Sequence, residues 1–311
     1  MKIGLLGYGV VGKGVVDIVD AHCPDLEVKY VLVRRPREEL GEKAVTDFNI
    51  MLNDPEVDII VEAMGGLSPA YEYVHAALEA GKNVVSSNKQ LISYYYDELA
   101  GLAMEKKVAL RCTAAVGGGI PWLTAIERGR RGNRIVGISG IMNGTTNYMM
   151  TRMEKEDISF EDVLRQAQEK GYAERNPEAD IEGHDACRKI AILSSLMCGK
   201  TVRYEDIPCE GISRVTMTDV AYARSMGRAI KLLGISERDE SAGTFYVRTA
   251  PYMVPDSHPL HGVEDVFNAV FVHGDAVDDT MFYGRGAGEL PTARAVVGDI
   301  IDVARNIKDN C

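Results

Sequence analysis

Short hydrophobic runs alternate with helical patterns along the first 130 residues of the chain. The runs predict strands, and apolar residues that recur every three or four positions predict helices between them. The strands are expected at 2–6, 28–34, 57–64, 83–87 and 108–112, and the helices at 11–22, 69–80 and 95–106. Regular alternation of strand and helix implies right-handed crossovers, so the pattern predicts an α/β domain with a doubly wound parallel sheet.

The pattern changes from Ile135 onward. Strand-like segments at 137–143, 244–254 and 267–277 are separated by helical patterns over 158–170, 185–198 and 218–233. This order is typical of an α+β domain with a mostly antiparallel sheet. Helical spacing in 291–306 predicts a last helix that returns to pack on the first domain. The expected parts are therefore 1–133, 134–282 and a returning segment at 283–311.

The composition narrows the class of protein. A length of 311 residues fits two domains. A net charge of −11 disfavours a nucleic-acid partner, because binding to phosphates depends on clustered Lys and Arg. The sequence holds no run of about 18 apolar residues, so no membrane span is expected. The six cysteines are scattered without a C-x-x-C pair, which favours reduced thiols and a cytoplasmic protein.

Three glycines follow the first expected strand with the spacing G-x-G-x-x-G. In a Rossmann-like domain the first permits a tight turn, the second lets the backbone approach a pyrophosphate, and the third lets the helix pack closely on the strand. An ordinary glycine-rich turn is the alternative, but the surrounding strand–helix–strand pattern favours a dinucleotide site. The expected cofactor turn comprises Gly7, Tyr8, Gly9, Val10, Val11 and Gly12.

The second expected strand ends in a basic segment, where NAD-dependent enzymes usually have an acidic residue on the ribose hydroxyls. Arg34 and Arg35 offer forked donors that match the 2′-phosphate of NADP. The alternative is a solvated basic loop. We therefore expect NADP as the cofactor, with NAD as the second choice.

Two groups of polar residues go beyond nucleotide binding. Lys89 follows the strand at 83–87, at the carboxyl edge of the parallel sheet where α/β folds bind ligands. Asp185 and Lys189 lie four residues apart on a helix with apolar residues on most sides. Such a pair is ordinarily a surface salt bridge. On a buried helix, however, charges are costly unless they are paired or used, which favours a role in chemistry.

Several segments, in this order, resemble the homoserine dehydrogenase family. They are GLLGYGVVG at 4–12, SSNKQL at 86–91, AVGGGIP at 115–121, GISGIMNGTTNYMMTRM at 137–153, GYAERNPEADIEGHDACRK at 171–189, HPLHGVEDVFNAV at 258–270 and YGRGAGELPTARAVVGDI at 283–300. The resemblance covers nearly the whole chain, and NGTTNYM and the spaced acids of the fifth segment are its most specific parts. It points to the minimal form of the family, without the C-terminal regulatory ACT domain.

The resemblance implies a homodimer that interconverts L-homoserine and L-aspartate 4-semialdehyde with a nicotinamide cofactor, in threonine and methionine biosynthesis. It implies that Lys89 and Lys189 are catalytic, that Glu174, Asp180 and Asp185 bind the substrate, and that Gly65, Lys89, Gly171 and Gly286 contact the cofactor. The ammonium group of homoserine needs carboxylates, and its hydroxyl needs a group that takes the proton. Lysine has an ordinary pKa of about 10.4, so burial beside a second ammonium is needed to lower it. We expect Lys189 to exchange the proton while Lys89 polarises the substrate oxygen.

Some positions depart from the family pattern. Thr113 stands where an acidic residue usually helps to bind a monovalent cation, so a site made of the Val116, Gly118 and Ile120 carbonyls would lack its charged ligand, and we assign no metal. Further departures are Arg175, Asn176, His261, Arg285 and Glu289. They leave two alternatives: a relative that acts on another amino-acid alcohol or aldehyde, and a catalytically weak NADP-binding protein. Retention of both lysines and all three acids disfavours the second, because a mere binder has no use for buried charges.

Overall fold

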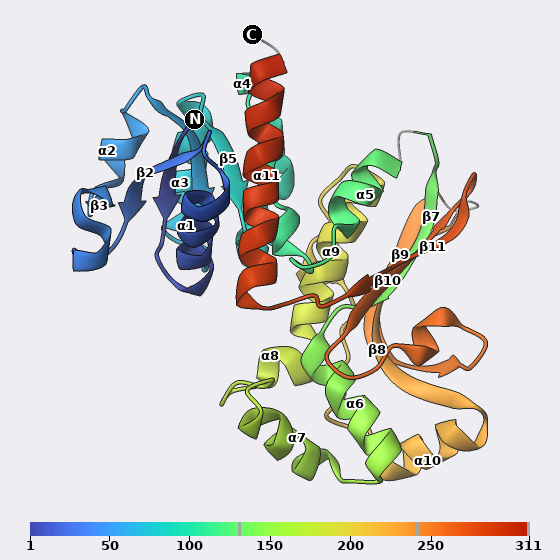
Figure 1. Ribbon diagram of the computed structural model, residues 1–311. Coiled ribbons are helices and arrows are strands. Elements are labelled where there is room, and N and C mark those ends of the chain that lie inside the picture. Colours follow the sequence, from blue (N-terminus) through green and yellow to red (C-terminus); the bar gives the residue numbers. More distant parts are fainter. Residues whose placement is uncertain (130–131, 240–242, 310–311) are drawn as a thin grey trace. The chain divides into compact units, whose positions relative to one another are not determined.

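The chain forms two compact units in the computed structural model, which describes residues 1–129, 132–239 and 243–309 (Figure 1). The first unit combines Met1–Gly119 with Ala287–Cys311, and the second comprises Ile120–Gly286. The sequence pattern predicts that the first domain ends at residue 133 and the second at residue 282. The structure instead begins the second unit at Ile120 and the returning segment at Ala287.

The described residues of the first unit form a six-stranded parallel sheet. The sequence predicts the parallel sheet and five of these strands, but not the short strand at 44–45. The strands are β1 (Lys2–Leu6), β2 (Glu27–Leu32), β3 (Ala44–Val45), β4 (Val57–Glu62), β5 (Asn83–Ser86) and β6 (Leu110–Arg111). Their order is β3-β2-β1-β4-β5-β6, so the winding reverses between β1 and β4. Ligands of doubly wound sheets bind at this switch point, outside the carboxyl ends of the strands.

Two hydrophobic clusters cover the two faces of this sheet. On one face, α1 (Val10–His22) and α11 (Glu289–Asp309) bring Val15, Val296 and Ile300 against the strands. On the other face lie α2 (Phe48–Leu52), α3 (Ala70–Glu79) and α4 (Lys89–Lys106). The last helix, α11, thus packs within the first unit.

The helix α4 is longer than the predicted helix at 95–106. Asn88 caps its N-terminus, because the Asn88 side chain accepts a hydrogen bond from the Leu91 N–H. Tyr95, at the predicted start, has the non-helical angles φ −126° and ψ 17°, where two helical segments join. Two 3-10 turns, η1 (Glu38–Lys43) and η2 (Thr113–Ala115), were not predicted either. The earlier start of α4 places Lys89 in its first turn.

The described residues of the second unit form a five-stranded antiparallel sheet, which confirms the predicted class. The strands are β7 (Ile135–Ile141), β8 (Arg228–Asp239), β9 (Thr244–Pro255), β10 (Asn268–Gly274) and β11 (Asp278–Gly284), in the order β11-β10-β7-β8-β9. The helix predicted over 218–233 is wrong in its second half. The helix α10 (Met217–Ser225) ends before Gly227, which has a φ of +65°. Residues 229–234 are all buried, which fits a strand inside a sheet better than an amphipathic helix.

Helices cover one face of this second sheet. Those that pack on its strands are α6 (Gly144–Glu156), α9 (His184–Cys198) and α10. The unit also contains α5 (Trp122–Gly129), α7 (Phe160–Glu169), which packs on α6, and α8 (Glu178–Ile181) and the turn η3 (Tyr204–Asp206), which pack on α9. The helix α9 packs so closely on β8 that a Cβ at Gly234 would lie 2.9 Å from the Ile190 Cβ. The register places Ile235, Phe271 and Met281 on the opposite face, which the turn η4 (Pro259–Gly262) covers in part.

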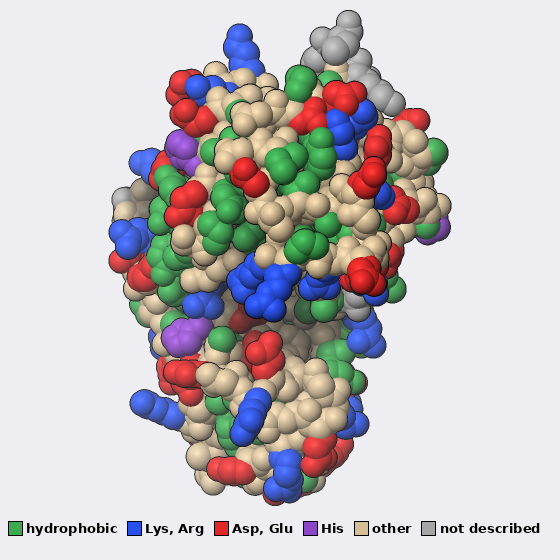
Figure 2. Space-filling view, turned by 90° about the vertical axis from the view of Figure 1, so that its left-hand side faces the viewer, with side chains coloured by type: hydrophobic (Ala, Val, Ile, Leu, Met, Phe, Trp, Pro, Cys, Tyr) green, Lys and Arg blue, Asp and Glu red, His purple; other side chains and the backbone are tan. Residues whose placement is uncertain are grey.

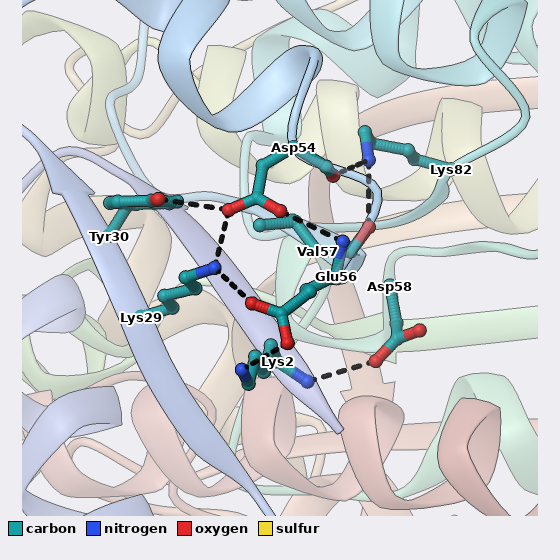
Figure 3. Close-up of polar contacts among 8 residues, drawn as sticks. All are labelled: Lys2, Lys29, Tyr30, Asp54, Glu56, Val57, Asp58 and Lys82. Carbon is teal, nitrogen blue, oxygen red and sulfur yellow. Dashed lines mark hydrogen bonds and ion pairs between the residues drawn. The ribbon is translucent and has the colours of Figure 1, made fainter.

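A network of charged side chains joins the starts of β1, β2 and β4 (Figure 3). The Lys29 Nζ lies 2.5 Å from the Asp54 Oδ2 and 2.6 Å from the Glu56 Oε2. The hydrogen bond from Lys29 lowers the pKa of Asp54 to about 2. The Lys82 Nζ donates to the backbone oxygens of Asp54 and Val57 at 2.8 Å each. This network lies at the edge of the sheet away from the carboxyl ends of the strands, so we assign it to the fold and not to ligand binding.

Acidic and basic side chains are interspersed over the face shown in Figure 2, apart from one small gathering of Lys and Arg. This face therefore carries no extended basic stripe of the kind that follows a phosphate backbone. Among the described residues, no helix is both long and apolar enough to cross a membrane.

Candidate active site

The glycine turn between β1 and α1 has the geometry of a dinucleotide site. Gly7 has a φ of +94°, a conformation that favours glycine. A Cβ on Gly12 would lie 2.2 Å from the Gly7 carbonyl oxygen, so only glycine lets α1 pack this closely on the turn. Gly9 is the N-cap of this 13-residue helix, and a Cβ there would have no described neighbour within 4 Å. The N-terminus of α1 is thus open to an approaching phosphate.

A cavity of about 870 Å³ lies beside this turn, and its volume is in the range of cofactor sites. Its walls are formed by Gly7, Tyr8, Gly9, residues 32–37, Thr46, residues 63–65, Ser68, Pro69 and Tyr73. Arg34 and Arg35 in the wall are exposed. The Arg37 guanidinium lies over the Tyr8 ring, 5.6 Å from its centroid. The cavity thus combines an open helix N-terminus with several guanidinium groups, and both attract phosphate.

In the second unit, Asp180, Asp185 and Lys189 meet around Asn143. The Lys189 Nζ lies 2.7 Å from the Asp185 Oδ2 and donates to the Met142 carbonyl oxygen at 2.6 Å. The Asn143 amide donates to the Asp180 Oδ1 at 2.7 Å and to the Asp185 Oδ2 at 3.0 Å. The Lys189 and Asp185 side chains are only 7% and 12% exposed. The alternative of a surface salt bridge is therefore wrong.

Three elements supply this acid–lysine cluster, which comprises Asn143, Asp180, Asp185 and Lys189. The helix α9 carries Asp185 and Lys189 one turn apart, α8 carries Asp180, and Asn143 joins β7 to α6. Asn143 also caps α6, because its side-chain oxygen accepts the Thr146 N–H at 2.9 Å. One amide therefore holds two carboxylates beside one ammonium. Paired carboxylates of this kind suit the ammonium group of a small substrate.

The other predicted residues lie outside this cluster. Glu174 is exposed between α7 and α8, and its carboxylate forms no hydrogen bond or ion pair with the described residues. Gly171 is also exposed and has a φ of +73°. Gly286 is buried, and a Cβ there would lie 2.6 Å from the Asn268 Cγ. Lys89 belongs to the first unit and is half-buried.

Thr113 has an acidic neighbour from α11. The Thr113 hydroxyl donates to the Asp299 Oδ1 at 2.7 Å, and its N–H donates to the Asp299 Oδ2 at 2.8 Å. Burial raises the pKa of Asp299 to about 6. The Ile120 carbonyl, one of the three considered above for a cation, accepts the Trp122 N–H at 2.9 Å. The described residues contain no cluster of three or more His, Cys, Asp or Glu side chains suited to a metal. The assignment of no metal to the Val116, Gly118 and Ile120 carbonyls stays a prediction.

Two groups of the acid–lysine cluster were not predicted from the sequence: the Asn143 side chain and the Met142 carbonyl. Asn143 stands directly before a helix start, and Asn is a favoured N-cap residue. This signal was overlooked because α6 itself was not predicted. The Met142 carbonyl leaves no signal in the sequence, since every residue carries the same backbone group.

A glycine turn at the switch point of a Rossmann-like sheet, together with a buried acid–lysine cluster in a second unit, defines an NAD(P)-dependent oxidoreductase. The family models agree with this class. The model described as homoserine dehydrogenase matches residues 121–301, and the model described as homoserine dehydrogenase, NAD binding domain, matches residues 7–112. The chain belongs to the homoserine dehydrogenase family, whose members interconvert homoserine and aspartate semialdehyde.

Relatives are similar along nearly the whole chain. Homoserine dehydrogenase of Bacillus subtilis is 42% identical, over 99% of this chain and 74% of its own. The Synechocystis enzyme is 44% identical, over 97% of this chain and 73% of its own. The crystal structure of a homoserine dehydrogenase from Thiobacillus denitrificans matches with a TM-score of 0.93 at 40% identity, over 99% of this chain and 74% of that one. A hyperthermophilic archaeal homoserine dehydrogenase in complex with NADPH matches with a TM-score of 0.84 at 25% identity, over 98% of both chains.

Proposed function

We propose that the protein is an NADP-dependent homoserine dehydrogenase that serves threonine and methionine biosynthesis. The observation that carries this proposal is the buried acid–lysine cluster in which the Asn143 amide holds Asp180 and Asp185 beside Lys189. Homoserine presents an ammonium group and a hydroxyl group, and the cluster offers carboxylates for the first and a lysine for the second.

The nucleotide cavity supports NADP as the cofactor. Gly9 leaves open space at the start of α1 for a pyrophosphate, and Arg34 and Arg35 stand at the end of β2 for a 2′-phosphate. We also assign cofactor contacts to the rest of the 7–12 turn and to Gly65, Lys89, Gly171 and Gly286. The nicotinamide, when bound, accepts or returns the hydride. The archaeal relative solved with NADPH is consistent with this choice.

Each charged residue receives a role in this proposal. Asp180 and Asp185 bind the ammonium group of the substrate, and Glu174 joins them from its exposed segment. Lys189 exchanges a proton with the substrate oxygen, and its Nζ is held in position by Asp185 and the Met142 carbonyl. Lys89 is the second catalytic lysine and polarises the same oxygen.

An assay of nicotinamide reduction with L-homoserine tests the proposal. We expect turnover with NADP, and weaker turnover with NAD. A panel of other amino-acid alcohols should react with lower kcat/KM. A higher kcat/KM on another alcohol would show that this alcohol, and not L-homoserine, is the preferred substrate. NADP binding without turnover on any alcohol would show that the protein is an NADP-binding protein without this activity.

We also propose that the protein is a homodimer joined through the second face of the antiparallel sheet. Ile235, Phe271 and Met281 are only half-buried on this face. Tyr246 and Tyr283 lie on the same face and are 48% and 54% exposed. Partly exposed apolar side chains on one face of a sheet are typical of a self-complementary interface.

The proposed compartment is the cytoplasm. Cys23, Cys112, Cys187, Cys198 and Cys209 are free thiols. Free thiols are typical of proteins that function in a reducing environment.

A further inference from the structure

The Glu62 carboxylate, at the carboxyl end of β4, has no exposed surface and no part in the proposed chemistry. Both of its oxygens nevertheless accept hydrogen bonds. The Oε1 accepts the N–H groups of Met64 at 2.8 Å and Gly65 at 3.2 Å, and the Asn88 amide approaches it at 3.4 Å. The Oε2 accepts the Ser86 hydroxyl at 2.6 Å. A buried carboxylate is costly, and these bonds from two separate loops offset that cost.

On the β4 side, Glu62 supports a loop that forms part of the cavity wall. Met64 and Gly65 line the nucleotide cavity. Gly65 and Gly66 have φ values of +74° and +76°, so two successive residues adopt the left-handed conformation. A loop of this shape has few intrinsic restraints, because glycine loses more conformational freedom on ordering than other residues. The hydrogen bonds from the Met64 and Gly65 N–H groups to Glu62 therefore fix the position of this loop.

On the β5 side, the same carboxylate supports the start of α4. The Ser86 hydroxyl that donates to Glu62 also accepts the Asn88 N–H at 3.1 Å. The Asn88 side chain caps α4 at Leu91 and donates to the Gly66 carbonyl at 2.6 Å. Lys89 is the next residue, so its backbone position is set by this capping residue.

We propose that Glu62 is a positioning residue that couples the nucleotide-contacting loop 64–66 to Lys89. The proposal deepens the proposed function and rests on it, because it takes Lys89 and Gly65 as cofactor contacts. One carboxylate holds both segments, so a dinucleotide that orders the loop also fixes the first turn of α4. Glu62 acts through Lys89 and through the loop, without touching the reacting atoms.

A double-mutant cycle on nucleotide affinity tests this coupling without any need for turnover. Glu62→Gln keeps the shape of the side chain but replaces one acceptor by a donor that faces the N–H and hydroxyl donors. We expect Glu62→Gln and Lys89→Ala each to raise the Kd for NADP by about 10-fold, the scale of one lost charge-assisted hydrogen bond. The double variant should also weaken binding by about 10-fold, because both changes break the same coupled unit. The proposal would be overturned if the Kd of the double variant rose by nearly the product of the two single increases, or if the Kd of Glu62→Gln were unchanged.

Two further variants separate coupling from general damage to the fold. Asn88→Ser keeps a good N-cap residue but loses the amide that reaches Glu62 and Gly66, so it should reproduce the affinity loss of Lys89→Ala. If Glu62→Gln does not fold, the Kd of Asn88→Ser for NADP tests the coupling in its place, and an unchanged Kd would overturn the proposal. Lys82→Met is the matched control, because Lys82 is buried in the same unit and hydrogen-bonded at the opposite edge of the sheet. It should lower the Tm and leave the Kd for NADP unchanged, and an equal affinity loss there would overturn the proposal.

The same proteins distinguish this proposal from the proposed function. Absence of turnover on L-homoserine by the wild-type enzyme, with the expected pattern of Kd values, would reject the proposed reaction and retain the coupling. Normal turnover by the wild-type enzyme with additive Kd values would reject the coupling and retain the reaction.

Discussion

The Asp185 Oδ2 lies 2.7 Å from the Lys189 Nζ, one turn further along α9, and the Asn143 amide donates to the same oxygen at 3.0 Å. One carboxylate oxygen thus accepts from an ammonium and from an amide. Asn143 uses its other amide hydrogen on Asp180. The position of Lys189 is therefore set both by its own helix and by the junction of β7 and α6.

Replacement of Lys189 by Met should lower kcat for L-homoserine by about 10²–10⁴-fold, the range of a lost general acid–base group. The Kd for NADP should stay unchanged, because Lys189 is not among the proposed cofactor contacts. Steady-state kinetics and calorimetry measure the two effects. Lys231→Met is the matched control, since Lys231 is also buried in this unit and donates to the Val263 carbonyl at 2.7 Å. Full activity in Lys189→Met would remove that lysine from the mechanism.

Replacement of Asn143 by Ser should raise the KM for L-homoserine by about 10-fold, the effect of one lost hydrogen bond to a charged group. Serine still caps α6, so the stability of the helix is kept while the bridge between the two carboxylates is lost. Asn147→Ser is the control, because the buried Asn147 amide donates to the Val263, Asp265 and Phe267 carbonyls instead. The control should lower the Tm with little change in KM. The same KM in Asn143→Ser and the wild-type enzyme would show that the bridge does not shape the substrate site.

Joint replacement of Arg34 and Arg35 by Ala should raise the Kd for NADP by about 10- to 100-fold, since each guanidinium can form charge-assisted hydrogen bonds with a phosphate. The Kd for NAD should change little, because NAD has no 2′-phosphate. Calorimetric titration with both nucleotides measures the difference. If the affinities for NADP and NAD fell by the same factor, these arginines would support the loop and would not select the cofactor.

The Asp299 carboxyl predicts a pH effect on stability. Its pKa is about 6 in the folded protein because of burial, against an ordinary value of 3.8. The folded state therefore binds more protons between these values, so the free energy of unfolding falls as pH rises from about 4 to about 6. The shift corresponds to about 3 kcal/mol. Asp299→Asn can still accept the Thr113 N–H and can donate to its hydroxyl, so it should lack this dependence. Denaturant unfolding of both proteins across this pH range measures it, and parallel pH profiles would contradict the assignment.

Replacement of Phe271 by Glu should convert the proposed dimer to a monomer, because it places a charge in the partly exposed face of the antiparallel sheet. Light scattering after size-exclusion chromatography gives the mass. Val277→Glu is the control, since Val277 is 58% exposed between β10 and β11, outside the strands that form this face. A dimer that survives Phe271→Glu would locate the interface elsewhere.

The parallel sheet was predictable because most of its strands are short, mainly apolar runs that alternate with helical patterns, which local sequence shows directly. The helix α6 was missed because Thr145, Thr146 and Asn147 are polar yet buried, so hydrophobic spacing does not reveal it. The strand β8 was assigned to a helix because the polar Lys231 interrupts its apolar run, although this lysine is buried as well.

The contacts of the candidate site also fall into those that local sequence predicts and those that it does not. Asp185 and Lys189 were found together because four-residue spacing is a local property of a helix. The contact of Asn143 with Asp185 spans 42 residues, and only the tertiary fold creates it.

The helix α11 packs on α1 and supplies Val296 and Ile300 to the core of the first unit, whose other elements lie within residues 1–119. The ribosome therefore synthesises the entire second unit before this part of the core can close. During translation, the apolar side chains of β1 and α1 that contact α11 lack these partners until the second unit has been synthesised. The second unit can complete its own core before α11 emerges, so the first unit, although its synthesis starts earlier, acquires this part of its core only after the second unit has been synthesised.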